Sequence, residues 1–77
     1  MIIDNEDKAL YFVYKRESVI YISRRAYYRK TGNRYYFIND HDEWVDVHQN
    51  ESFKTRREAV EFINRFYKEI IRERILI

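Results

Sequence analysis

The 77-residue chain contains no cysteine, no proline and a single glycine. The absence of cysteine excludes a disulfide framework and thiolate metal sites, and it fits a reducing compartment. No stretch rich in Pro, Gly or Ser separates two parts of the chain, so we expect a single domain over residues 1–77. The chain also lacks a long apolar run and a signal-like start, which predicts a soluble cytoplasmic protein without membrane contact.

Residue patterns typical of enzymes are missing as well. The serines, Ser18, Ser23 and Ser52, have no flanking glycine that would build a nucleophile elbow. A single glycine is too few for a phosphate-binding loop of the usual kind. His41 and His48 lie near several aspartates, but their spacing matches no recognised metal site, and aspartates are common in turns for conformational reasons. We therefore expect no catalytic activity, no metal and no cofactor.

Aromatic residues, by contrast, are abundant, with eight Tyr, five Phe and one Trp. A chain of this length buries only about 60% of the surface that its unfolded form exposes. Each aromatic ring can remove roughly 150–250 Å² from water. The rings therefore allow a dense core without disulfides or metals.

The first two thirds of the chain have the alternation and the turn residues of a sheet over about residues 9–48. The expected turns are at 15–18, 31–33 and 39–43, where polar residues and the single glycine gather. The expected strands of this meander are 9–14, 19–30, 34–39 and 44–48.

The second of these strands has the longest alternating pattern. Ile20, Ile22, Ala26 and Tyr28 would share one face, and the residues between them would share the other. Arg24 falls on the apolar face, which predicts a bulge, or a strand that extends beyond its cover at this point.

A helix is expected at about residues 55–73. Thr55 and Glu58 form a T-x-x-E capping box at its start. Apolar residues then recur at spacings of three and four, and these are Ala59, Phe62, Ile63, Phe66, Tyr67, Ile70 and Ile71. The predicted architecture is α+β, an antiparallel meander sheet of three to four strands packed on one C-terminal helix.

Charge is nearly balanced in total but segregated along the chain. Fifteen Lys and Arg face thirteen Asp and Glu, and the formal net charge is +2. No acidic residue occurs from Ser18 to Asn39, and acidic residues follow directly after it. The basic residues of that window are Arg24, Arg25, Arg29, Lys30 and Arg34. A local basic stripe of this kind is typical of proteins that bind nucleic acid or an acidic protein.

Basic and aromatic residues are interleaved on the face that a single helix would leave uncovered. The outward residues are expected to come from Tyr21, Arg25, Tyr27, Arg29, Tyr36 and Trp44. Guanidinium groups pair with phosphates and rings stack on bases, while Tyr, Trp and Arg are also enriched at protein interfaces. A third interpretation is that the aromatic pairs stabilise the sheet and the arginines only solvate it.

Residues 52–66, SFKTRREAVEFINRF, resemble the strand-to-helix junction of the N-terminal arm-type DNA-binding domains of tyrosine-type phage integrases. The matching positions are Phe53, Lys54, Thr55, Glu58 and Ala59. The resemblance implies a three-stranded sheet plus a helix, and DNA held by the exposed sheet face. No recombinase catalytic domain follows, so the resemblance implies a freestanding module.

The sequence thus predicts a small non-enzymatic nucleic-acid-binding protein, with duplex DNA as the expected ligand. The candidate contact residues are Arg24, Arg25, Tyr27, Tyr28, Arg29, Lys30, Arg34, Tyr36 and Trp44. The alternative hypothesis is a protein-binding module encoded by a phage or other mobile element, which would inhibit a host enzyme or defence protein. A third hypothesis is a homo-oligomer formed through the aromatic face or through residues 75–77.

Overall fold

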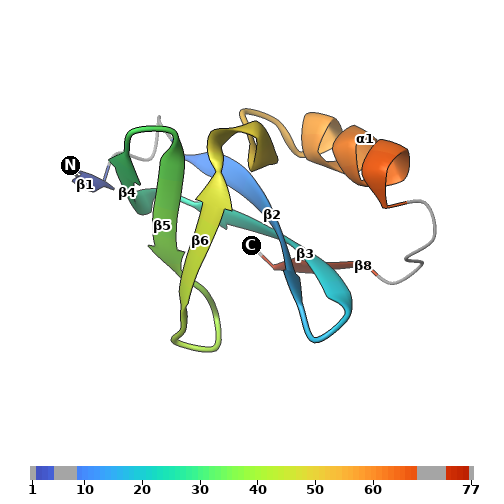
Figure 1. Cartoon of the computed structure of the whole chain (residues 1–77), viewed down its shortest axis with the longest axis horizontal. Coiled ribbons are helices and arrows are strands. Elements are labelled where there is room, and N and C mark those ends of the chain that lie inside the picture. The colour runs from blue at the N-terminus through green and yellow to red at the C-terminus, as the bar shows by residue number, and fades with distance from the viewer. Residues whose placement is uncertain (1, 5–8, 68–72, 77) are drawn as a thin grey trace.

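The computed structural model describes residues 2–4, 9–67 and 73–76 (Figure 1). In these residues, strands dominate and one α-helix follows them. The elements are β1 (Ile2–Asp4), β2 (Leu10–Arg16), β3 (Val19–Arg25), β4 (Tyr27–Thr31), β5 (Arg34–Ile38), β6 (Trp44–His48), the 3-10 helix η2 (Gln49–Glu51), β7 (Ser52–Phe53), α1 (Arg56–Phe66) and β8 (Glu73–Leu76).

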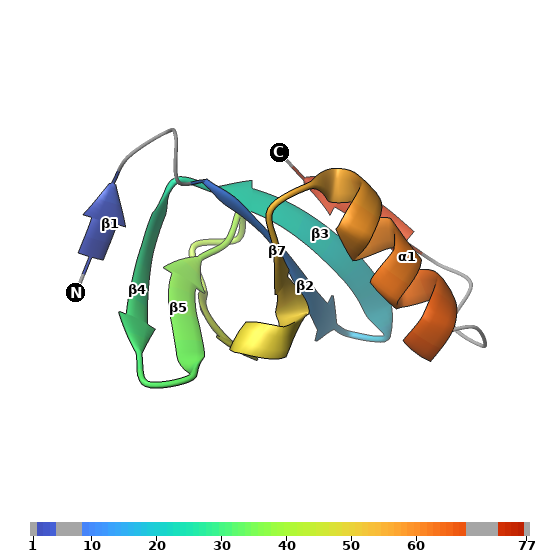
Figure 2. The same ribbon diagram turned by 90° about the horizontal axis from the view of Figure 1, so that it is seen from above.

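The strands form two sheets that pack on each other. The first sheet has the strand order β1-β4-β5-β6, and all of its pairs are antiparallel. The second sheet has the order β7-β2-β3-β8, in which β8 runs parallel to β3. Figures 1 and 2 show the second sheet in the middle of the molecule, with the first sheet on one side and α1 on the other.

One continuous stretch of chain contributes to both sheets. It leaves the second sheet at the end of β3, bends at Ala26 and enters the first sheet as β4. A strand that bends in this way forms a corner between two packed sheets. Of the two alternatives expected at Arg24, the bulge is wrong, because Arg24 stands opposite Tyr11 in an unbroken register with β2. The break in the strand falls two residues later, at Ala26.

Aromatic rings fill the space between the two sheets. Phe12 of β2 stacks on Phe37 of β5 at a centroid distance of 4.6 Å, and it meets Tyr28 of β4 edge-on at 5.5 Å. Tyr14 and Tyr21 stack on each other at 5.2 Å in the same cluster. Part of the aromatic content therefore forms a core between the two sheets, where ring pairs add to the stabilisation that burial provides.

The helix covers the other face of the second sheet. Ala59 and Ile63 of α1 pack against Val13, Ile20 and Ile22. The expected capping box is present, since the Glu58 amide donates to Thr55 Oγ1 at 3.2 Å and the Thr55 amide donates to Glu58 Oε1 at 3.3 Å. Both bonds satisfy amides that the first turn of a helix leaves without a partner.

The predicted α+β class is confirmed, with meandering strands followed by a helix near the C-terminus. The structure differs from the expected single sheet, because the strands divide into two sheets. Both faces of β2 and β3 are apolar, so one helix could cover only one of them, and the first sheet covers the other.

The helix is shorter than the expected 55–73. It ends at Phe66, where the Tyr67 cap leaves helical geometry at φ −126° and ψ 39°. Glu73 begins strand β8, so the helix prediction is wrong at this last residue. Ile70 and Ile71 lie outside the described residues. The apolar spacing continued past Tyr67, but spacing alone does not reveal where the backbone leaves the helix. In the described part of the chain, no helix is long and apolar enough to span a membrane.

Candidate functional site

The outer face of the first sheet carries exposed rings. Alternation along β4, β5 and β6 turns Tyr27, Tyr36, Ile38 and Trp44 away from the core, together with Arg29. Tyr27 is 65% exposed, Trp44 68% and Ile38 47%. We call these five residues the aromatic face. Exposed rings and an exposed isoleucine in one place are unusual on a surface that has no partner.

Strand register fixes how the residues of the aromatic face are arranged. Arg29 stands opposite Tyr36 across the β4–β5 pair, and Ile38 stands opposite Trp44 across the β5–β6 pair. Between these side chains the face is hollowed into an open depression of about 460 Å³. Its lining includes the rings of the face and Ile38, with Arg25 and Arg29 as its charged groups. The depression is therefore mostly apolar, with cations at its border.

Arg25, at the rim of this depression, is held by the protein itself. Its Nη2 lies 2.6 Å from Asp40 Oδ1, its Nε donates to the Ile38 carbonyl at 3.1 Å, and its Nη1 donates to the Arg24 carbonyl at 2.9 Å. Only 15% of its side chain is exposed. Arg25 therefore joins the end of β3 to the β5–β6 loop, and this internal role occupies the guanidinium that the sequence suggested for phosphate contacts.

Arg34, at the start of β5, is also paired. Its Nε lies 2.6 Å from Asp46 Oδ1 on the neighbouring strand β6. The hydrogen bond to Asp46 is the main reason that the pKa of Arg34 is raised. Arg34 lies near the aromatic face, but Asp46 compensates its charge.

Arg29 differs from both of these arginines. It lies exposed on the outer side of β4, next to Tyr36. Among the described side chains, no carboxylate lies within ion-pair distance of its guanidinium. Arg29 is therefore available to an anionic ligand at the border of the aromatic face.

Three of the nine predicted contact residues lie elsewhere. Tyr28 is 5% exposed and packs its ring in the core between the sheets, where burial raises its pKa. Arg24 belongs to β3 in the second sheet, opposite Tyr11. Lys30 faces the other way from Arg29 along β4, and its Nζ lies 5.7 Å from the centroid of the Tyr35 ring. These three residues therefore lie outside the aromatic face, and their contact with nucleic acid stays a prediction.

The structure brings together Tyr27, Arg29, Tyr36 and Trp44 of the predicted set, with Arg25 and Arg34 beside them. Tyr21, expected on the uncovered face, is buried between the sheets instead. Ile38 was missed, although its alternation with Tyr36 along β5 could have identified it.

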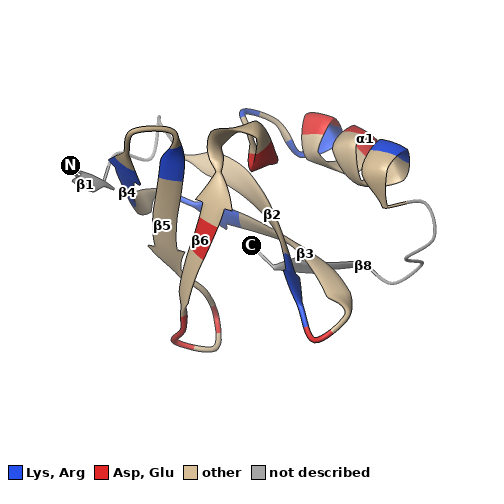
Figure 3. Cartoon of the chain, in the orientation of Figure 1, with Lys and Arg blue, Asp and Glu red and all other residues tan. Residues whose placement is uncertain are grey.

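Charge along the first sheet is divided between its two ends. Figure 3 shows basic positions at the β4–β5 hairpin and acidic positions in the β5–β6 loop. Lys30 and Arg34 flank that hairpin, whereas the loop carries Asp40, Asp42 and Glu43. The dipolar surface expected from the sequence is thus present, and it runs along the strands of the first sheet.

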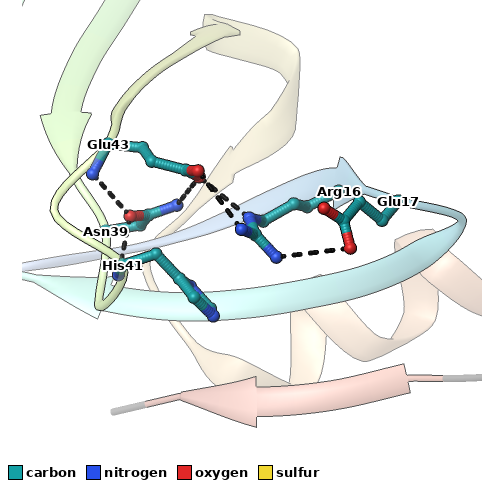
Figure 4. Close-up of polar contacts among 5 residues, drawn as sticks. All are labelled: Arg16, Glu17, Asn39, His41 and Glu43. Atoms are coloured by element: carbon teal, nitrogen blue, oxygen red, sulfur yellow. Dashed lines mark hydrogen bonds and ion pairs between the residues drawn. The ribbon is translucent and has the colours of Figure 1, made fainter.

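A second depression, of about 350 Å³, lies between β2 and β6. Arg16 and Glu43 form an ion pair beside it, and Asn39 holds Glu43 in turn (Figure 4). These contacts satisfy the charged groups within the protein. Part of the polar lining of this depression is therefore already engaged within the protein.

Both histidines take part in local hydrogen bonds, His48 through its side chain and His41 through its backbone amide. His48 Nδ1 accepts a hydrogen bond from the Asn50 amide at 3.1 Å and so caps η2. The His41 amide donates to Asn39 Oδ1 at 2.9 Å within the β5–β6 loop. Over the residues with described positions, no three His, Asp or Glu side chains gather as metal ligands would.

No protein-family model, no curated protein and no solved structure matches this chain. The arm-type resemblance therefore stays a prediction from residues 52–66, and the functional argument rests on the geometry of the aromatic face.

Proposed function

We propose that the protein is a small nucleic-acid-binding module without catalytic activity, and that it contacts its ligand through the aromatic face. The observation that carries the proposal is the combination, on one sheet face, of the exposed rings of Tyr27 and Trp44 with the exposed cation of Arg29, which has no ion-pair partner among the described side chains. Rings stack on bases of any sequence, and a guanidinium beside them pairs with the phosphates that join those bases.

Electrostatics support a modest number of phosphate contacts. Arg29 is free of carboxylates among the described side chains, and Lys30 and Arg34 mark the basic hairpin end. Arg25 and Arg34 are engaged by Asp40 and Asp46, so fewer cations are available than the sequence suggested. With on the order of two or three phosphates neutralised, the logarithm of the affinity should fall with the logarithm of salt concentration at a slope of about −2.

The test is fluorescence anisotropy of labelled oligonucleotides over a salt series, with wild-type protein and two variants. Arg29→Ala removes the exposed cation of the aromatic face. Arg65→Ala removes an exposed cation of α1 and is the matched control, because the change in net charge is the same. We expect Arg29→Ala to weaken binding and to reduce the salt slope by about 1. Arg65→Ala should bind like the wild type.

Two results would overturn the proposal. One is an absence of binding by the wild type at low salt. The other is an equal loss of affinity in both variants, which would show that net charge and not the aromatic face governs binding.

A protein partner is the second candidate, and the mainly apolar lining of the depression favours it. Tyr, Trp and Arg are also the residues that dominate protein interfaces. On this hypothesis the chain blocks a host enzyme or defence protein. A stoichiometric complex should then be captured from nuclease-treated lysate by the wild type and lost with Trp44→Ala. A complex that disappears on nuclease treatment would favour nucleic acid instead.

A further inference from the structure

We infer that the ligand of the aromatic face is single-stranded nucleic acid, with unstacked bases lying on Tyr27, Tyr36 and Trp44 and the connecting phosphates near Arg29. This inference rests on the proposed function and narrows it to one class of ligand. It differs from the duplex DNA that the sequence alone suggested.

The width of the first sheet argues against a duplex. Its four strands lie side by side in the order β1-β4-β5-β6. At a spacing of about 4.8 Å between neighbouring strands, the outer two lie about 14 Å apart. The major groove of B-DNA is only about 12 Å wide and the minor groove about 6 Å. The four-stranded sheet as a whole is therefore too wide to lie flat within a groove of an undistorted duplex.

The three rings of the aromatic face do not stack on other described rings. Core rings such as Phe12 and Phe37 stack on each other, but among the described residues Tyr27, Tyr36 and Trp44 make no such contact with another aromatic ring. Tyr27 and Trp44 are largely exposed and Tyr36 is partly exposed, so a ligand can reach these rings. In a duplex the faces of the bases are covered by their neighbours, whereas a single strand can turn its bases onto such rings.

The spacing of the rings also fits successive bases of one strand. Tyr27, Tyr36 and Trp44 come from the three adjacent strands β4, β5 and β6. The register places Tyr36 opposite Arg29 and Asp46, two residues away from Tyr27 and from Trp44, so these diagonal neighbours lie about 7–8 Å apart and the outer two rings about 10 Å apart. These separations leave room for a base at each ring, and they are too wide for the three rings to form one continuous stack.

The charges of the aromatic face favour single-stranded nucleic acid over a second copy of the chain. Arg29 needs an anion, and Asp46, the acidic residue that β6 carries nearest to the rings, is already paired with Arg34. Two aromatic faces in contact would therefore bury Arg29 against a face that carries no free carboxylate among its described residues. A phosphodiester supplies that anion together with the rings' stacking partners.

Trp44 allows a direct test, because it is the only tryptophan of the chain and 68% of it is exposed. The full chain is titrated with a single-stranded oligonucleotide of about 15 nucleotides, as DNA and as RNA, and with the corresponding duplex. Tryptophan fluorescence reports stacking on Trp44, and anisotropy of the labelled oligonucleotide reports binding. We expect the single strand to quench Trp44 and to bind at least about tenfold more tightly than the duplex.

Variants test the other rings. Tyr27→Ala and Tyr36→Ala should each weaken single-strand binding by about tenfold, the loss typical of one stacked base. Phe66→Ala is the matched control, since Phe66 is 62% exposed but lies on α1, on the other side of the second sheet. It should leave the affinity unchanged. Circular dichroism of each variant checks that the fold is retained.

The outcomes separate this inference from the proposed function. Equal or tighter binding of the duplex without quenching of Trp44 would overturn the single-strand inference and leave nucleic-acid binding in place. Binding of neither form at low salt would overturn both. Equal losses in Tyr27→Ala and Phe66→Ala would show that the aromatic face is not the stacking surface.

Discussion

Arg16 and Glu43 form a two-point ion pair between the ends of the two sheets. Arg16 Nε lies 2.8 Å from Glu43 Oε1, and Arg16 Nη2 lies 3.2 Å from Glu43 Oε2 (Figure 4). Arg16 ends β2, whereas Glu43 directly precedes Trp44 of β6. Asn39, which is buried, accepts a bond from the Glu43 amide and donates another to its carboxylate. The pair therefore positions the start of β6, and with it the side of the aromatic face that carries Trp44.

Acid should weaken the fold through Glu43. The hydrogen bond and charge of Arg16 lower the pKa of Glu43 from its ordinary value of 4.5 to about 2. A carboxylate whose pKa is lowered by folding contributes stability that is complete above its unfolded pKa and is lost as the pH falls towards the folded pKa. Wild type should therefore melt at a higher temperature than Glu43→Gln at pH 7, and the gap should close between about pH 5 and pH 2. Because the pair is partly exposed, we expect a small gap that salt reduces.

Thermal melts at several pH values measure this gap. Glu17→Gln is the control, because it removes a second carboxylate beside Arg16. This carboxylate is exposed and lies 3.8 Å from Arg16. A wild-type advantage over Glu43→Gln that stays constant down to pH 2 would contradict the role given to Glu43.

Phe12→Ala should destabilise the protein strongly. Phe12 is fully buried and its ring contacts those of Tyr28, Tyr35 and Phe37. Removing a buried phenylalanine side chain typically costs about 3–5 kcal/mol of the free energy of unfolding. Urea denaturation followed by circular dichroism measures this cost, and Phe12→Leu should retain more of the stability. A loss below about 1 kcal/mol for the alanine variant would contradict the central place of Phe12.

Thr55→Ala should cost about 1 kcal/mol of the free energy of unfolding, because it removes the oxygen that accepts the Glu58 amide at the start of α1. Thr55→Ser keeps that oxygen and is the matched control. Urea denaturation of the two variants should place serine close to the wild type and alanine below it. Equal stability of the two would mean that the capping bond contributes little.

Asp46→Asn should strengthen binding of nucleic acid. The change removes a negative charge beside the aromatic face and releases Arg34 from its ion pair. We expect tighter binding and a salt slope that is steeper by about 0.7 for a single strand, the increment of one further phosphate contact. Anisotropy over a salt series measures both quantities.

Glu61→Gln is the control for this gain. It makes the same change in net charge and releases Arg57 of α1 from a pair at 3.7 Å. An equal gain in both variants would indicate a general effect of charge, and no gain with Asp46→Asn would argue against phosphate contacts near Arg34.

Local signals in the sequence determined most of the secondary structure. Alternation located β2, β5 and β6, and it located β3 and β4 as one strand over 19–30, while the T-x-x-E pattern located the start of α1. The turn expected at residues 15–18 forms around Glu17 and Ser18, both with positive φ, and Gly32 has the positive φ expected of the next turn. Such signals depend on neighbouring residues only, so one sequence suffices to read them.

The candidate site was predicted in part for the same reason. Alternation within each of β4, β5 and β6 decides which side chains point outward. The outward residues share one face as expected, and they are Tyr27, Arg29, Tyr36 and Trp44. Whether Arg25 and Arg34 were free could not be predicted, because their carboxylate partners, Asp40 and Asp46, lie 15 and 12 residues further along the chain. Such pairs form only once the strands have been brought together.

The bend at Ala26 was decided by tertiary structure alone. Along an unbroken strand, Tyr21 and Tyr28 must point to opposite faces, because their numbers differ by an odd count. Both lie in the core between the sheets, since the chain turns from the second sheet into the first between them. The sequence by itself therefore determined which residues alternate, whereas packing the two sheets around one aromatic core decided which of the alternating residues meet solvent. The physical reason is that alternation is a property of one strand, while burial depends on what the rest of the chain places against it.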